Sequence, residues 1–318
     1  MTKGSLQYWP RKRARKRLPR IRESRKTADV PSLSNIVGYK AGMCQLNLID
    51  DSESPSKSLE VNRACTIIEI PKTELYGIRL YKRNGITKYL ESSDEVLNAE
   101  LCKKIGMKNI ENNELKLEAF KGKLKDYVDV SALLVAYPKT VSVEQHKPVR
   151  FEAKIIANDI AQKFEIASGL LGKEVKAIDI FKNGEFIDVT SISKGKGWSS
   201  AIKRHHIARL DHKATQKTRH MGVLGSYGMG RVLYSVPHSG QLGFNYRTEY
   251  NKRLLKISSD KLDKKQGFRN YGSINSDYII IEGSIPGPAK RLVRLRKTLR
   301  NKNKNGIKEP KINEIILN

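Results

Sequence analysis

The residue types that could do chemistry gather in residues 194–256, which hold five of the chain's six histidines and eight glycines. A histidine cluster can bind a metal ion when further ligands lie at a suitable spacing. Here His205, His206, His212 and His220 have no cysteine or carboxylate ligand at such a spacing, and the H-E-x-x-H pattern does not occur. Histidines among lysines and arginines are more typical of phosphate or RNA contacts. The sequence therefore predicts no metal site.

The glycines resemble a phosphate-binding loop only loosely. Gly225, Gly228 and Gly230 are not accompanied by G-K-[ST], and they do not lie between a predicted strand and a helix. The G-x-S-x-G nucleophile pattern does not occur, and no set of Ser, His and Asp stands out. We therefore predict that the chain is not an enzyme and has no cofactor and no small-molecule substrate.

The same stretch is well suited to binding nucleic acid. Glycine lets the backbone approach a phosphate closely, and interleaved Lys and Arg neutralise the phosphate charge. Flat faces on which an unpaired base could stack are offered by Trp198, Tyr227, Phe244 and Tyr246. For Trp198 and Phe244 a place in the hydrophobic core is an equally open alternative. Tyr227, next to glycine and without apolar neighbours, is predicted to lie at the tip of a loop.

Positive charge is concentrated in three stretches of the chain. Residues 1–26 carry a net charge of +10, residues 194–256 carry +11 and residues 286–311 carry +9, while the remaining 203 residues carry −2. Like charges at this density repel one another, so we expect the stretches to stay open in isolation. Nucleic acid is the polyanion that best neutralises them.

The basic run at residues 11–17 has other readings when taken alone. It also suits a nuclear localisation signal or a solvated tail. An organellar transit peptide is a further alternative, although Pro10 and Pro19 would interrupt its amphipathic helix. No apolar run approaches the roughly 18 residues of a transmembrane helix, and the three cysteines have no paired spacing. We therefore expect a reduced, intracellular protein with no membrane partner.

Short runs of Ile, Val, Leu and Tyr, bounded by turn-forming residues, predict a mainly β fold. Asn183 and Gly184 form a type I′ hairpin signal between two of these runs. Strands are predicted at residues 36–49, 64–70, 77–82, 133–137, 175–181, 186–192, 231–236 and 278–282.

Helices are predicted at two places. Residues 95–105 carry one apolar face, and a second helix begins at Asn158 or Asp159 and ends near Gly172. Residues 109–150 are polar and weakly periodic, which is typical of an insertion in the β body. For the basic segment after residue 286, strand and short helix are both open.

Five blocks carry a resemblance to a known family. They read KGSLQYWPRKRARKRLPRIR, NIVGYKAGM, SISKGKGWSSAIKRHH, GQLGFNYRTEYNKRLLKI and YIIIEGSIPGPAKRLVRLRK. In this order they resemble the universal large-subunit ribosomal protein three family, and the first block is similar to its archaeal and eukaryotic branch. The resemblance implies a β-barrel body of the translation-factor type with an α+β insertion. It also implies long basic extensions that thread into large-subunit rRNA, a loop tip near the peptidyl transferase centre and early binding in subunit assembly.

The resemblance extends to individual positions of the basic central loop, residues 194–256. Residues 194–197 match the start of the family's loop, and residues 240–253 match its return limb. Trp198 stands where phenylalanine is usual, and Tyr227 stands where many relatives of this branch have tryptophan. No glutamine near the tip corresponds to the one that bacterial relatives modify.

We therefore predict a structural constituent of the large ribosomal subunit, cytoplasmic, with large-subunit rRNA and neighbouring ribosomal proteins as partners. A DNA-compacting protein and an RNA-modifying enzyme are the alternatives. The predicted parts are an N-terminal extension (1–34), a barrel body (35–83 and 172–285), an α+β insertion (84–171), the central loop (194–256) and a basic C-terminal segment (286–318). The predicted RNA-binding residues are Arg11, Lys12, Arg13, Arg15, Lys16, Arg17, Lys194, Lys196, Trp198, Lys203, Arg204, His205, Arg219, His220, Tyr227, Arg231, Gln241, Phe244, Arg247, Asn251, Lys252, Arg253, Lys290, Arg291 and Arg294.

Overall fold

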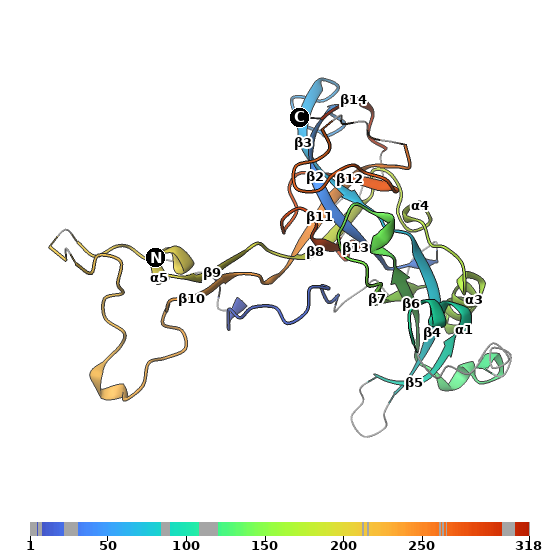
Figure 1. Ribbon diagram of the computed structural model, residues 1–318, viewed down its shortest axis with the longest axis horizontal. Coiled ribbons are helices and arrows are strands. Elements are labelled where there is room, and N and C mark those ends of the chain that lie inside the picture. Colours follow the sequence, from blue (N-terminus) through green and yellow to red (C-terminus); the bar gives the residue numbers. More distant parts are fainter. Residues whose placement is uncertain are drawn as a thin grey trace.

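The computed structural model describes residues 5, 8–21, 31–83, 90–107, 120–211, 213–214, 216–260, 262, 264, 266–300 and 309–317. The chain is mainly β, as predicted, and the strands described pair in antiparallel fashion. Two larger sheets form the bulk of the molecule, and a long two-stranded projection leaves it on one side (Figure 1).

The larger sheet closes on itself. β13 pairs with β8 on one side and with the first residues of β2 on the other, which completes a ring of strands. β14 (Ile312–Ile316) pairs with the second half of β2. The ring runs in the order β2 (Asn35–Ile49), β3 (Glu60–Glu69), β12 (Tyr278–Glu282), β11 (Tyr246–Ser258), β8 (Phe186–Ile192) and β13 (Leu292–Lys297). This closed ring agrees with a barrel body, and its likeness to translation-factor barrels stays a prediction.

The hydrophobic pattern explains the places of two strands, β12 and β2, in the ring. β12 reads YIIIE, and its first four residues are buried, as is typical of a central strand covered on both faces. The second half of β2 instead alternates, with Cys44 and Leu46 buried while Gln45 and Asn47 are partly exposed. This period of two matches a strand with one face toward the core.

A second sheet packs beside the barrel and shares its core. Its strands lie in the order β1 (Ser32–Leu33), β7 (Val149–Ile156), β6 (Asp129–Ala136), β4 (Thr73–Arg83) and β5 (Leu90–Leu97). α3 (Ile160–Leu170) packs on one face of β6, and α1 (Ala99–Lys104) covers the other through Leu101 and Cys102. Short turns of helix, η2 (Leu124–Asp126) and η3 (Pro138–Thr140), flank β6. Because β4 belongs to this sheet, the change from barrel to second sheet comes before Thr73 rather than at residue 84.

Three predicted elements differ in the structure. Residues 175–181 were predicted to be a strand but contain the helix α4 (Ala177–Ile180), because a short apolar run fits either period. The type I′ hairpin is wrong, since Gly184 has a φ of +81° but Asn183 is not in the left-handed region. Residues 231–236 form no strand and have no facing strand in the part of the chain that the structure describes; residues 231–234 lie exposed.

The first predicted helix begins later than expected. Residues 95–97 end strand β5, and the Oδ1 atom of Asn98 accepts a hydrogen bond of 3.2 Å from the Leu101 amide, which starts α1 at Ala99. The second helix, α3, follows Asp159 and ends at Leu170, as predicted. Residues 108–119, in the predicted insertion, lie outside the described residues.

The basic C-terminal segment is not an open arm where the structure describes it. β13 is a strand of the barrel ring, which decides between the strand and the short helix that the sequence left open. Its residues Leu292–Arg296 are buried, including two arginines. Residues 301–308 lie outside the described residues.

The basic central loop divides between the barrel and a projection. β9 (Gly195–Ser199) and β10 (Gly240–Gly243) pair as a two-stranded stem, and beyond it lie α5 (Ala201–His205) and η4 (Tyr227–Met229). β11 pairs with β8 and β12 in the barrel, so only residues 194–245 project. We call this projection the finger; Figure 1 shows it extending away from both sheets.

Gly243 at the base of the finger predicts a local effect of substitution. Its φ is +74°, and a Cβ atom there would run into the Lys194 carbonyl oxygen of the facing strand. We expect Gly243→Ala to lower the free energy of opening of the stem by about 1–3 kcal/mol. Hydrogen exchange and limited proteolysis of residues 194–245 measure this.

Gly228→Ala is the matched control, because open space surrounds that position and its φ is not in the left-handed region. Equal protection of the stem in the two variants would show that Gly243 is not required.

Candidate nucleic-acid interface

The N-terminal extension runs along the base of the finger and the adjoining barrel strand. The Ala14 amide donates to the Phe244 carbonyl at 2.8 Å, and the Asn245 side-chain amide donates to the Lys12 carbonyl at 2.7 Å. The Tyr246 hydroxyl donates to the Lys16 carbonyl at 3.1 Å. These contacts use the backbone of the extension, so its cationic side chains stay available to other partners.

Two arginines fasten the extension to the finger reciprocally. Arg11 donates to the Arg204 carbonyl at 3.0 Å, and Arg204 donates to the Arg11 carbonyl at 3.0 Å. Arg204 also donates to the carbonyls of Gln241 and His238, each at 3.0 Å. Burial, followed by the charge of Arg247, lowers the pKa of Arg11, and burial, followed by the charge of Arg11, lowers the pKa of Arg204. Both guanidinium groups therefore serve the protein's own architecture.

An aromatic stack continues this contact. The Trp9 ring lies over the His205 ring with their centroids 5.1 Å apart, and His205 is almost completely buried. Two segments of the same charge sign are therefore held together by carbonyl acceptors and ring stacking. The sequence predicted that the basic stretches stay open in isolation, but these two are docked on each other, because backbone acceptors offset the repulsion.

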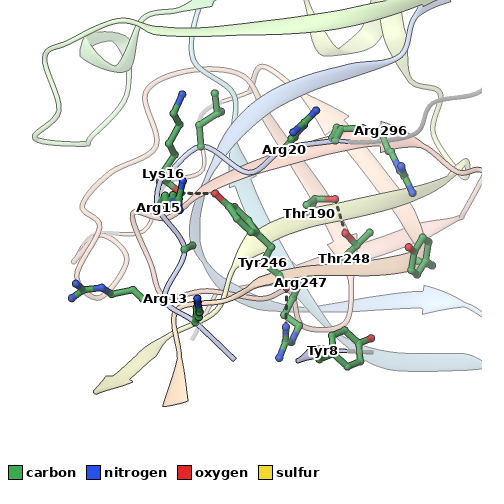
Figure 2. A pocket seen from close by; sticks show the side chains of 15 residues that line it. Tyr8, Arg13, Arg15, Lys16, Arg20, Thr190, Tyr246, Arg247, Thr248 and Arg296 are labelled. Carbon is green, nitrogen blue, oxygen red and sulfur yellow. Dashed lines mark hydrogen bonds between the residues drawn. The ribbon is translucent and has the colours of Figure 1, made fainter. Parts of the chain in front are cut away.

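A basic pocket lies between the extension and the barrel wall (Figure 2). Its volume is about 740 Å³, and no acidic side chain is among the residues that line it. The Thr190 and Thr248 hydroxyls lie 3.1 Å apart on neighbouring strands, and Tyr246 stands between these strands and the extension. The lining residues are Tyr8, Lys12, Arg13, Ala14, Arg15, Lys16, Leu18, Arg20, Ile21, Thr190, Tyr246, Arg247, Thr248, Tyr250 and Arg296.

About half of the sequence-predicted RNA-binding residues are exposed. They lie on the extension and along the finger, where a large partner can reach them. These residues are Lys12, Arg13, Arg15, Lys16, Arg17, Lys194, Lys196, Trp198, Lys203, Arg219, His220, Tyr227 and Arg231. Trp198 is 79% exposed, so the core alternative is wrong for this residue.

A second group is partly buried and bound within the protein. Lys252, Arg253 and Lys290 form ion pairs with Glu249, Asp51 and Glu144. The Asn251 side chain accepts a hydrogen bond of 2.6 Å from the Thr298 hydroxyl.

Arg291, Phe244 and Arg247 belong to the same partly buried group, with Arg11, Arg204 and Gln241. The Arg291 guanidinium lies 5.1 Å from the Phe244 ring centre, and Arg247 lies 4.8 Å from the Tyr8 ring centre. Phe244 is thus part of the finger base, whereas Arg247 faces the pocket.

Arg294 is inside the protein, which removes it from the surface that RNA could contact. Its guanidinium donates to the Asn35 side chain at 2.7 Å, to the Glu152 carbonyl at 2.6 Å and to the Pro19 carbonyl at 3.2 Å. Burial lowers its pKa to about 10. Arg294 therefore joins the barrel, the second sheet and the extension. His205, also buried, is likewise withdrawn from direct RNA contact.

Sequence reasoning named Tyr246 as a stacking candidate but missed Thr190, Tyr250 and Arg20, which also line the pocket. Tyr246, Thr248 and Tyr250 alternate along β11 and therefore point to one face of the strand. This alternation in FNYRTEY was a visible signal, but the partner residue Thr190 on β8 and the covering residue Arg20 could not be paired with it from sequence alone.

The end of the finger differs in character from its stem. Residues 221–234 carry a single charged side chain, Arg231, and several large apolar residues that are exposed. Tyr227 is fully exposed at the turn η4, in agreement with the predicted tip. The exposed apolar residues are Val223, Leu224, Met229, Val232, Leu233 and Tyr234.

Three further observations concern the part of the chain that the structure describes. Within it, no group of three or more His, Cys, Asp and Glu side chains is placed to hold a metal ion. None of its helices has the length and apolar character needed to span a membrane. The three cysteines are buried as free thiols.

The structure defines a β-barrel protein with a docked basic extension and a long projecting finger. Comparison with known proteins gives the family: the model of ribosomal protein L3 matches residues 1–317. Large ribosomal subunit protein uL3 of Methanobrevibacter smithii is 38% identical, over 95% of this chain and 93% of its own length. The uL3 protein of Methanothermobacter thermautotrophicus is 36% identical, over 98% and 95%.

The chain therefore belongs to the ribosomal protein L3 family. It is a ribosomal protein and a structural component, not an enzyme, as the sequence predicted. Membership also rules against the DNA-compacting and RNA-modifying alternatives.

Proposed function

We propose that this protein is a structural constituent of the large ribosomal subunit, in the cytoplasm, and that it binds large-subunit rRNA through the N-terminal extension and the finger. The observation that carries the proposal is the way in which these two segments hold each other. Their contacts use backbone carbonyls, as between Arg204 and Arg11, and leave the neighbouring cations exposed. One continuous basic surface results.

The charge of this surface suits a phosphate backbone. Residues 8–21 contain no acidic residue, and residues 194–245 contain one, Asp211. Cations held in a fixed array displace the counterions of a nucleic acid when they bind it, which is the main source of affinity in such complexes. The surface is therefore built for an extended polyanion that follows the extension and the finger together.

The end of the finger supports a different mode of contact. With Arg231 as its one charge and Tyr227 fully exposed, residues 221–234 contact by stacking and apolar packing rather than by charge. We propose that the cationic stem passes through rRNA and that the apolar tip lies toward the peptidyl transferase centre. Early incorporation during subunit assembly and contacts with neighbouring ribosomal proteins belong to the same proposal.

The test of the proposed placement is Tyr227→Ala. Because the Tyr227 side chain is fully exposed, we expect the free energy of unfolding to change by no more than about 0.5 kcal/mol. Subunits that contain the variant should assemble and sediment normally through a high-salt gradient. They should differ from wild type in aminoacyl-tRNA accommodation or in sensitivity to drugs of the peptidyl transferase centre.

Tyr227→Trp is the control, since it keeps a flat aromatic ring and should behave as wild type. If Tyr227→Ala unfolded the isolated protein, the residue would belong to a core. If assembled subunits behaved as wild type in every respect, the tip would not act near the catalytic centre.

A further inference from the structure

We propose that the basic pocket between the N-terminal extension and the barrel holds one unpaired nucleotide of RNA, flipped out of its stack. The inference rests on the proposed function, because it assumes that the protein binds RNA. It adds a discrete site to that function: a cavity that receives a single base together with its phosphate, at a place distinct from the finger tip.

The size and enclosure of the cavity favour one nucleotide. About 740 Å³ is within the range of about 300–1,000 Å³ that is typical of small-molecule sites. The cavity lies under the extension, with residues 8–21 on one side and strands β8 and β11 on the other. A base pair inside a helix cannot enter a space covered in this way, whereas an unstacked base can.

The interior offers what a base and a ribose require. Tyr246 and Tyr250 are 41% and 55% exposed and lie on the same face of β11, so their rings are accessible from the cavity that they line. Base stacking on an aromatic ring is the contact that most RNA-binding sites use for unpaired bases. The paired hydroxyls of Thr190 and Thr248 can donate and accept, which suits a base edge or a ribose 2′-hydroxyl.

The rim offers what a phosphate requires. Arg13, Arg15, Lys16 and Arg20 are exposed and belong to the extension that covers the cavity, and Arg247 adds a cation from β11. Lys and Arg in an acid-free setting favour an anion. Flat rings, hydroxyls and cations in one cavity match the base, the ribose and the phosphate of a nucleotide.

The experiment uses the full chain, an unbulged RNA hairpin and four versions of that hairpin with a single bulged nucleotide. The bulged nucleotide is a different base in each of the four. We expect at least one bulged hairpin to bind roughly fivefold or more tightly than the unbulged one. Tyr250→Leu, which removes the ring but keeps apolar volume, should abolish this preference. Ultraviolet cross-linking of the wild-type complex should join the bulged nucleotide to a peptide that contains Tyr246 or Tyr250.

Tyr137→Leu is the matched control, because Tyr137 is a partly exposed tyrosine directly after β6 that belongs neither to the finger nor to the residues lining the pocket. It should leave the preference unchanged. Thr248→Val, which keeps the side-chain shape and removes a hydroxyl, is the second variant and should reduce the preference about threefold. Melting curves establish that both pocket variants are folded.

The outcomes separate the two proposals. If all hairpins bind equally and with a steep salt dependence, the pocket inference is overturned while RNA binding by the protein stands. If folded Tyr250→Leu and Thr248→Val keep the full preference, the bulged nucleotide binds elsewhere and the inference is overturned as well. If no hairpin binds, the proposed RNA-binding function fails together with the inference.

Discussion

Replacing Asp188 by alanine is expected to lower the free energy of unfolding by about 3–5 kcal/mol, because it removes the carboxylate from a buried ion pair. Asp188 is fully buried on β8 and pairs with Arg296 of β13 at 3.1 Å. The same carboxylate accepts from the backbone amides of Asn251 at 3.1 Å and Leu299 at 3.4 Å. Its removal leaves a buried guanidinium and two amides without their acceptor. Chemical denaturation of the isolated protein measures the effect.

Arg63→Ala is the control for this prediction. Arg63 and Glu282 also form an ion pair between neighbouring strands, but they are 3.8 Å apart and both are substantially exposed. Such pairs contribute at most about 1 kcal/mol. If the two substitutions had equal effects, the ring closure at β13 would not depend on the buried pair.

Replacing the five exposed cations of residues 12–17 by glutamine is expected to weaken binding to a large-subunit rRNA fragment more than any other surface change. Each lost phosphate contact should reduce the slope of log affinity against log salt by up to about 0.9, so the slope should fall by up to about 4.5 units. Affinity at moderate salt should fall at least about tenfold. The residues changed are Lys12, Arg13, Arg15, Lys16 and Arg17.

The extension should stay docked in this variant, because its contacts run through the backbone carbonyls of Lys12 and Lys16 and through Arg11. The matched control replaces five exposed lysines on the second sheet and its helices by glutamine, which removes the same total charge. A comparable loss of affinity in the control would show that net charge, and not the extension, determines binding. The control residues are Lys103, Lys104, Lys121, Lys123 and Lys139.

The sequence predicted the strands of the barrel well where apolar runs were long or strictly alternating. The run YIIIE of β12 and the alternation at the end of β2 have no competing interpretation. It failed at the short runs 175–181 and 231–236. The first fits a helical turn as easily as a strand, and the second has no facing strand in the part of the chain that the structure describes.

The prediction of site residues was limited by a different factor. Counting bases found the extension and the finger, but it could not separate cations that face solvent from those that hold the protein together. In the segment LVRLRK, Arg294 and Arg296 look like part of a basic arm, yet both are buried because β13 lies between β8 and β2. Arg204, Arg253 and Lys290 are likewise bound to internal acceptors or acids.

The sequence by itself determined the near-neutral β body and the concentration of charge in basic segments. Through the five blocks that resemble a known family, it also determined the family to which the chain belongs. These properties depend on composition and local order, which do not change when the chain folds. Only the tertiary structure decided that the extension docks on the finger base and that a pocket forms beneath it. Both require residues more than 200 positions apart, such as Lys16 and Tyr246, to meet, and their contact uses backbone carbonyls that every sequence has.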